Sequence, residues 1–172
     1  MNRRMVFFLV GQILKAEAAL LALPLIVSLL YKEIGYLSFL ITIGIALVLG
    51  FGLTLISRPK NKVIYAKEGF VVVALAWLVM SAVGALPFVI SGSIPSYVDA
   101  LFETVSGFTT TGSSLIPDVE DLEHGILFWR SFTHWIGGMG VLVFVLAVIP
   151  NFSDRSIHLI RAEMAGPIIG KL

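Results

Sequence analysis

The residue types that could do chemistry in this chain gather in one uncharged run of hydroxyl side chains and glycine. Its members are Thr109, Thr110, Thr111, Gly112, Ser113 and Ser114. An ion that has lost its water needs a cage of oxygens, and backbone carbonyls supply one without burying a carboxylate. The run therefore suits the binding of a cation, although most runs of this composition are surface loops.

Gly112 is the one residue of this run that can readily adopt unusual backbone dihedrals. An extended segment whose carbonyls face one axis requires such freedom. We therefore expect Gly112 to lie in a conformation that a side chain disfavours, with its Cβ-free surface against packed protein. A helix that ends just before the run would aim its negative end at the same place, which favours a cation.

A short helix is predicted immediately before the run. Pro95 and Ser96 give its start, with Ser96 as the N-cap and Asp99 in the first turn. From Tyr97 onward, apolar residues recur on one face: Val98, Leu101, Phe102, Val105 and Phe108. The helix has about three turns and is too short to cross a bilayer. We therefore expect a re-entrant loop, in which the segment 109–114 returns in a non-helical conformation.

The elements that must position this loop are membrane-spanning helices. The chain has 172 residues, of which 58% are hydrophobic and 13% charged, whereas a soluble domain has about 25% charged residues. Apolar stretches of about 20 residues, the length that crosses the hydrocarbon core, predict four spans at 5–31, 37–56, 69–90 and 128–149. The predicted fold class is an all-α membrane protein with four transmembrane helices and one re-entrant helix.

Several residues inside the first two predicted spans indicate how these helices behave. Lys15 and Glu17 interrupt the first span, where they could pair or extend toward the interface. Pro24 would kink the same helix. Close helix packing is indicated in the second span by three glycines, Gly44, Gly50 and Gly52.

Basic and acidic segments alternate along the chain and predict its orientation in the membrane. Basic residues gather in the N-terminal segment, the loop 57–69 and the tail: Arg3, Arg4, Arg58, Lys60, Lys62, Lys67, Arg155, Arg161 and Lys171. The segment 91–127 has six acidic residues and neither Lys nor Arg: Asp99, Glu103, Asp118, Glu120, Asp121 and Glu123. We expect both termini inside and an acidic outer face, which either concentrates cations or is simply hydrated.

Small and aromatic residues at the start of the fourth predicted span indicate packing and anchoring. Gly137, Gly138 and Gly140 are expected to let another helix approach closely, rather than to contact an ion. Trp129 and Trp135 are expected to be anchors at the membrane interface.

Three charged or titratable residues near the run have two interpretations each. Arg130 and His134 lie one helical turn apart, and we expect them at the headgroup level. The alternative is that they brace the loop through Glu103 or Asp121. Glu103 itself could attract cations or could be a hydrogen-bonded part of the structure.

Two motifs give the chain a resemblance to a known family. The segments ALFETVSGFTTTGSS and FWRSFTHWIGGMG, with the third predicted span, resemble the first membrane–pore–membrane repeat of the Trk/Ktr/HKT superfamily of potassium-uptake proteins. The likeness to its Trk-H-type subunits extends over the whole chain, because two extra N-terminal helices precede the first repeat there too. It implies a potassium-channel-like repeat at 69–150, two helices and a basic cytoplasmic loop at 1–68, and a cytoplasmic linker with an interfacial helix at 151–172.

The resemblance also implies roles for the run. The selectivity filter would be Thr110, Thr111, Gly112 and Ser113, with K⁺ held by the backbone carbonyls of Thr110, Thr111 and Gly112. Four such repeats surround one pore in the family, so three more must come from a longer chain or from other copies. The resemblance further implies a homodimer, a cytosolic nucleotide-binding regulatory subunit and a bacterial cytoplasmic membrane, with K⁺ as the transported ion and no bound cofactor.

Other classes of function fit less well. A hydrolase using Ser113 or Ser114 with His134 would lack a Gly-x-Ser-x-Gly elbow and a carboxylate placed to orient the histidine, so we expect conduction and no enzyme. The chain has no cysteine for a disulfide or a thiolate metal site, and its net charge of +1 gives no attraction to nucleic acid. A four-span scaffold or assembly protein without transport remains the alternative.

Overall fold

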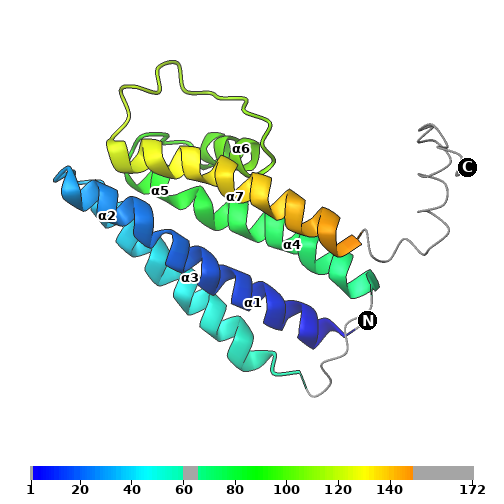
Figure 1. Ribbon diagram of the computed structural model, residues 1–172. Helices are drawn as coiled ribbons and strands as arrows, with labels where there is room; N and C mark the ends of the chain where they lie inside the picture. Colours follow the sequence, from blue (N-terminus) through cyan, green and yellow to red (C-terminus); the bar gives the residue numbers. More distant parts are fainter. Residues whose placement is uncertain (1, 60–65, 149–172) are drawn as a thin grey trace, which may run out of the picture. The chain divides into compact units, whose positions relative to one another are not determined.

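The structure, a computed structural model, describes residues 2–59 and 66–148, which form seven helices and no strand (Figure 1). The chain divides into two compact units, residues 1–137 and 138–172. Within the second unit only the last part of a helix, 138–148, is described. The predicted interfacial helix at 151–172 and the middle of the basic loop lie outside the described residues.

The first predicted span forms two consecutive helices, α1 (Arg3–Leu20) and α2 (Ala22–Leu30). The interruption lies at Leu21, three residues before Pro24. A proline has no amide hydrogen to bond the carbonyl four residues earlier, so the helical ladder is weakened there. The helix is thus disturbed where the sequence predicted a kink.

The second predicted span is α3 (Tyr36–Ile56), which packs along α1. Gly11 and Gly50 allow this close approach, because a Cβ added to Gly11 would lie 2.8 Å from the Gly50 carbonyl oxygen. The predicted packing role is therefore right for Gly50. For Gly44 and Gly52 it remains a prediction, because an added Cβ would meet nothing within 4 Å among the described residues.

The third predicted span also forms two helices, α4 (Ala66–Gly84) and α5 (Leu86–Ile90). The interruption at Ala85 was not predicted. Its cause is visible in the sequence, since Pro87 cannot donate an amide hydrogen bond to the carbonyl of Val83.

Three described stretches are long and apolar enough to cross a membrane, namely Arg3–Leu30, Tyr36–Ile56 and Glu68–Ile90. The fourth predicted span largely coincides with α7 (His124–Val148), a helix of 25 residues. At 1.5 Å per residue it is about 37 Å long, enough to cross the hydrocarbon core. The crossing by α7 remains a prediction.

The short helix before the run is α6 (Tyr97–Phe108), with the bounds that the sequence predicted. The Ser96 hydroxyl caps it by accepting a hydrogen bond from the Asp99 amide at 3.4 Å. Residues 109–114 are not helical, and the chain returns from there to the start of α7, as Figure 1 shows. Both features match the predicted re-entrant loop.

A core cluster joins the N-terminal helices to the loop-bearing helices. Its buried members are Leu21, Phe39, Ala85, Phe88, Ile94, Ala100, Phe108, Ile126 and Trp129. Trp129 is fully buried, and its indole nitrogen donates to the Gly84 carbonyl at 2.8 Å. The expectation that Trp129 anchors at the interface is therefore wrong, because its polar atom is satisfied inside the protein. Trp135 is exposed, and its anchoring role remains a prediction.

The turn between α2 and α3 caps the start of α7. Glu33 accepts hydrogen bonds from the amide of His124 at 2.6 Å and from the amide of Gly125 at 3.0 Å. The Tyr31 ring stacks on the His124 ring with centroids 3.9 Å apart. A carboxylate suits the positive end of a helix, and this one comes from 91 residues away in the sequence. The turn between α2 and α3 and the end of the segment 91–127 were both predicted to lie on the outer side of the membrane, and here they are in contact.

Candidate functional site

The end of α6 holds the backbone of the hydroxyl-rich run through its last carbonyls. The Thr110 amide donates to the Gly107 carbonyl at 2.9 Å, and the Thr111 amide donates to the Ser106 carbonyl at 2.9 Å. The Gly112 amide donates to the same Ser106 carbonyl at 3.4 Å. These bonds satisfy carbonyls that a helix end otherwise leaves without partners.

The direction of these amides fixes the direction of the carbonyls in the run. In a planar trans peptide unit, the carbonyl oxygen points opposite to the next residue's amide hydrogen, and no described peptide bond is cis. Since the Thr111 and Gly112 amides point at α6, the carbonyls of Thr110 and Thr111 point away from it. Within the described part of the chain, no hydrogen bond reaches the carbonyls of Thr110, Thr111 or Gly112. Carbonyls without protein partners are what an oxygen cage for a cation requires.

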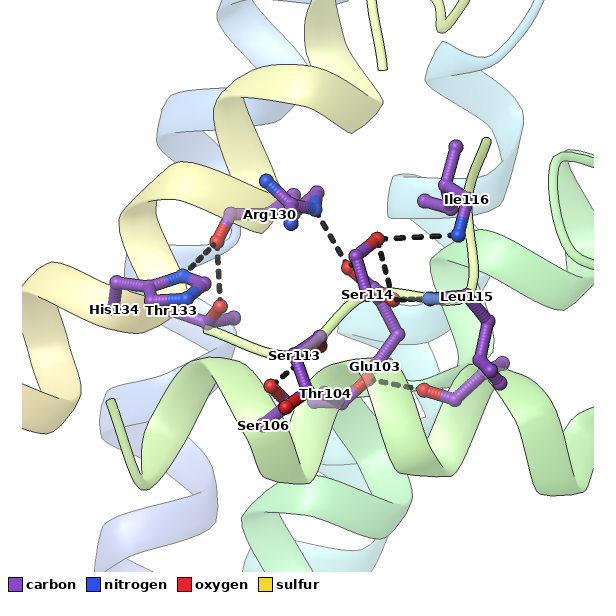
Figure 2. Close-up of polar contacts among 11 residues, drawn as sticks. Glu103, Thr104, Ser106, Ser113, Ser114, Leu115, Ile116, Arg130, Thr133 and His134 are labelled. Atoms are coloured by element: carbon purple, nitrogen blue, oxygen red, sulfur yellow. Dashed lines mark hydrogen bonds and ion pairs between the residues drawn. The ribbon is translucent and has the colours of Figure 1, made fainter. Parts of the chain in front are cut away.

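The hydroxyl groups of the run and of α6 support this backbone rather than pointing at one axis. Ser106 Oγ donates to the Ser113 carbonyl at 2.6 Å, which turns that carbonyl toward α6 (Figure 2). Thr109 Oγ1 donates to the Val105 carbonyl at 2.7 Å and lies 2.8 Å from Thr111 Oγ1. This role of Ser106 was not predicted, although a hydroxyl group two residues before the end of the helix was a visible signal.

Two residues of the run have a positive φ, and only one of them was expected. Gly112 has φ +77°, a region that glycine adopts without steric cost, so the predicted dihedral freedom is used. Thr110 has φ +57°, which is unfavourable for a β-branched residue. The assignment of unusual dihedrals to Gly112 alone is therefore wrong, and the run holds strain that its contacts with α6 must offset.

The space beside Gly112 is open in the described part of the chain, whereas close packing was expected there. A Cβ added there would meet nothing within 4 Å among the described residues. The expectation that the Cβ-free surface faces packed protein is therefore wrong for this chain by itself. Any cost of a side chain at Gly112 must come from its dihedral angle or from what faces the run in the assembled protein.

Glu103 is the hub that ties the return segment to α6 (Figure 2). Its carboxylate accepts from Ser114 Oγ at 3.0 and 3.1 Å and from the Leu115 amide at 3.1 Å. Arg130 Nε donates to Glu103 Oε1 at 2.6 Å, so α7 holds the same carboxylate. Of the two interpretations of Glu103, the structure supports the hydrogen-bonded one.

Arg130 therefore braces the loop, and the expectation of a headgroup position is wrong for this residue. Its side chain is 17% exposed and that of Glu103 is 1% exposed, because the pair lies between α6, α7 and the return segment. His134 lies one turn further along α7, where its Nδ1 is 3.1 Å from the Arg130 carbonyl oxygen. The alternative partner Asp121 is exposed.

Glycines let α6 and α7 approach each other. A Cβ added to Gly137 would lie 2.1 Å from the Phe108 carbonyl oxygen, and one added to Gly107 would lie 2.1 Å from Thr133 Oγ1. The predicted packing role of Gly137 is thus confirmed, and its partner is the last residue of α6. This contact places the C-terminal end of α6 directly against α7.

The apolar stripe predicted for α6 is mostly not the face that packs on this chain. Val98 is 72% exposed and Phe102 is 45% exposed, whereas Ala100 and Thr104 are buried. Of the stripe, Phe108 is fully buried and Leu101 packs against the core cluster, whereas Val98, Phe102 and Val105 are left without a cover among the described residues.

The acidic residues of the return segment do not gather into a metal site. Asp118, Glu120 and Asp121 are exposed. In the described ranges, no three acidic or histidine side chains lie close enough together to hold a metal ion.

Comparisons with known proteins agree with this geometry. The pattern of the TrkH family, described as cation transport protein, matches residues 37–172. The chain is 36% identical over 169 residues to the Trk system potassium uptake protein TrkH of Escherichia coli K12, covering 98% of this chain and 35% of that relative. It is 42% identical over 158 residues to an uncharacterized cation transporter of Methanocaldococcus jannaschii, covering 92% of this chain and 33% of that relative.

A solved structure shows the same fold. The crystal structure of the potassium transporter TrkH from Vibrio parahaemolyticus matches with a TM-score of 0.82 and 32% sequence identity. The match covers 94% of this chain and 36% of that one. The chain thus spans about a third of the length of the relatives that it matches.

Proposed function

Because the chain belongs to the TrkH family of cation transport proteins, we propose that it takes part in the uptake of potassium, or a closely related monovalent cation, across a cell membrane. The relatives from E. coli and V. parahaemolyticus are named as potassium transporters. Since the chain covers 35% of the E. coli relative, the proposal concerns an assembled protein in which this chain supplies one membrane–pore–membrane repeat at 69–150.

The observation that carries the proposal is the orientation of the run's backbone. The amides of Thr111 and Gly112 bond to α6, so the carbonyls of Thr110 and Thr111 point away from the helix that holds them. These two carbonyls, with that of Gly112, replace part of the hydration shell of K⁺ as it passes. Ser113 ends the filter strand, because its carbonyl is engaged by Ser106.

The charges around the run attract a cation but do not bind it tightly. The C-terminal end of α6, which carries partial negative charge, lies directly beneath the run. Glu103 is paired with Arg130, so its charge is balanced and it serves to position the loop. Conduction then needs no covalent chemistry and no cofactor, and K⁺ is the substrate.

The wider assembly follows from the incomplete filter. One repeat cannot enclose an axis, so further repeats, from the same longer chain or from other copies, complete the ring. By analogy with the Trk-H-type subunits, we place the protein as a homodimer in a bacterial cytoplasmic membrane, with both termini inside and a cytosolic nucleotide-binding regulatory subunit. The exposed stripe of Val98, Phe102 and Val105 is the surface that would contact the other repeats.

Flux in cells tests the proposal. The intact protein is produced in cells that lack their own potassium-uptake systems, and growth at low potassium and the initial rate of rubidium entry are measured. We expect growth to be restored and rubidium to enter. A protein that is present in the membrane but admits no rubidium, even when the other Trk-type components are supplied, would instead support the alternative of a four-span scaffold.

A further inference from the structure

Glu17, in the last turn of α1, is a fully buried carboxyl group that the proposed conduction does not use. Its exposed fraction is 0%. Among the described residues, neither of its carboxyl oxygens has a hydrogen-bond partner. Buried acidic side chains are normally paired or hydrogen-bonded, so an enclosed carboxyl without partners requires an explanation.

Glu17 lies where α1 meets the end of α4. A Cβ added to Gly84, at the end of α4, would lie 3.2 Å from Glu17 Oε1. The same point is 3.1 Å from Thr104 Cγ2 of α6 and 3.2 Å from Trp129 Cζ2 of α7. The carboxyl group therefore packs beside the Gly84 backbone, at a point that a methyl group of α6 and an indole ring of α7 also approach.

The charged groups on these helices have other partners or lie elsewhere. Lys15 lies two residues away on a different face of α1, and its Nζ lies 5.0 Å from the centre of the Phe51 ring on α3. Arg130 of α7 pairs with Glu103 of α6. Glu68 lies 16 residues before Gly84, or about 24 Å along α4.

A metal ion does not fit this place. A bound cation needs several oxygen ligands, and of the three atoms nearest to the added Gly84 Cβ the two that do not belong to Glu17 are carbons. The hydroxyl group of Thr104 is already donated to the Ala100 carbonyl at 2.7 Å. A proton, in contrast, needs only the carboxyl group itself.

We propose that Glu17 is a proton-binding site: it carries a proton in the folded protein, and this neutral carboxylic acid is what lets α1 pack against the end of α4. An isolated carboxylate at this place would be a buried charge without compensation. The bound proton therefore stabilises the contact of α1 with α4, the helix that packs against α6. Loss of the proton would favour separation of α1 from the end of α4.

Infrared difference spectroscopy on the intact purified protein tests the proposal and does not depend on transport. The carbonyl stretch of a protonated carboxylic acid absorbs apart from amides and from carboxylates. We expect this band at neutral pH in the wild type and its loss in Glu17→Gln. The matched control is Glu68→Gln, because Glu68 is also buried but accepts a hydrogen bond from the Asn2 amide at 3.1 Å; its band difference should not match that of Glu17→Gln.

Transport by the same variants gives a second readout. Glu17→Gln keeps the shape and neutrality of the protonated acid, so the protein should accumulate normally and rubidium entry should stay within about twofold of wild type. The proposal is overturned if the difference spectrum shows a carboxylate and no acid band. It is also overturned if Glu17→Gln fails to accumulate, or if sodium or potassium ions abolish the acid band at constant pH.

Discussion

Arg130 Nε lies 2.6 Å from Glu103 Oε1, and this ion pair joins α7 to α6 across 27 residues of sequence. The same carboxylate holds Ser114 and the Leu115 amide. One buried carboxylate thus fixes the return segment to both of the helices that frame it. The geometry of the run thus depends on Arg130, which lies 16 residues after Ser114 in the sequence.

Arg130→Ala should disrupt the loop, because it leaves the Glu103 carboxylate buried without its cation. Removing one member of a buried ion pair costs about 3 kcal/mol. We expect lower thermal stability of the intact protein and a fall in rubidium entry of roughly tenfold. The control is the double variant Glu103→Gln with Arg130→Gln, which removes both charges and should recover much of the loss. Wild-type flux in Arg130→Ala would show that the pair does not position the run.

Two neighbouring carboxyl groups at the cap of α7, those of Glu33 and Glu123, should have opposite effects on thermal stability. Burial alone would raise the pKa of Glu33, but hydrogen bonds from the Gly125 and His124 amides and the His124 ring outweigh it and hold the pKa below its ordinary value. Burial, and then the charge of Glu33, raise the pKa of Glu123, whose Oε2 has no hydrogen-bond partner in the described residues. At neutral pH, Glu33→Gln should therefore lower the melting temperature and Glu123→Gln should raise it.

The directions of these two pKa shifts also determine how the stability of the fold depends on pH. The lowered pKa means that Glu33 stabilises the fold above the ordinary glutamate pKa of about 4.3, and that this contribution is lost as the pH falls through the folded-state value. The raised pKa of Glu123 gives a gain that is present at low pH and lost as the pH rises. Melting curves of the wild type and the two variants between acid and neutral pH check both contributions. Equal melting temperatures of Glu33→Gln and wild type at neutral pH would contradict the cap.

Gly137→Ala should separate α7 from the end of α6. Its new Cβ would lie 2.1 Å from the Phe108 carbonyl oxygen, a backbone atom that cannot move without shifting the run. We expect a clear loss of rubidium entry with the protein still inserted, as measured by flux per amount of protein in the membrane. Gly44→Ala is the matched helical control, because its Cβ would meet nothing within 4 Å among the described residues. Similar flux in the two variants would argue against the contact.

The local features of the loop could be predicted from the sequence, whereas its long-range contacts could not. The start of α6 depends on the side chain of Ser96, which caps the backbone three residues later, and its end coincides with a change to threonines and glycine. Such signals act within one helical turn. The choice of Arg130 between the headgroup region and Glu103 depends on how α6 and α7 pack, which no local pattern contains.

Contacts between distant segments also explain the other differences between the predicted and the observed structure. Glu33 caps a helix 91 residues away, and Trp129 is buried because its indole reaches Gly84. The stripe of α6 was predicted from periodicity, but periodicity does not say whether an apolar face meets its own chain or another repeat. The interruption before Pro87 was readable in principle, since a proline inside a helix removes one hydrogen bond.

The measurement that tests the central claim most directly compares Gly112 with Gly92. Gly112 has φ +77° and Gly92 has φ +79°, and an added Cβ would meet nothing within 4 Å of either among the described residues. Serine or aspartate at either position therefore meets a similar conformational cost, about 1–2 kcal/mol for a left-handed residue. Only Gly112 lies in the run.

Rubidium and sodium entry are measured for the intact protein in cells lacking their own uptake systems. If the run is the filter, Gly112→Asp abolishes rubidium entry, and Gly112→Ser mainly weakens the preference for rubidium over sodium because other repeats still supply their carbonyls. Gly92→Ser and Gly92→Asp leave both rates close to wild type. Transport by Gly112→Asp at the wild-type rate, or equal losses at Gly92 and Gly112, would contradict the account.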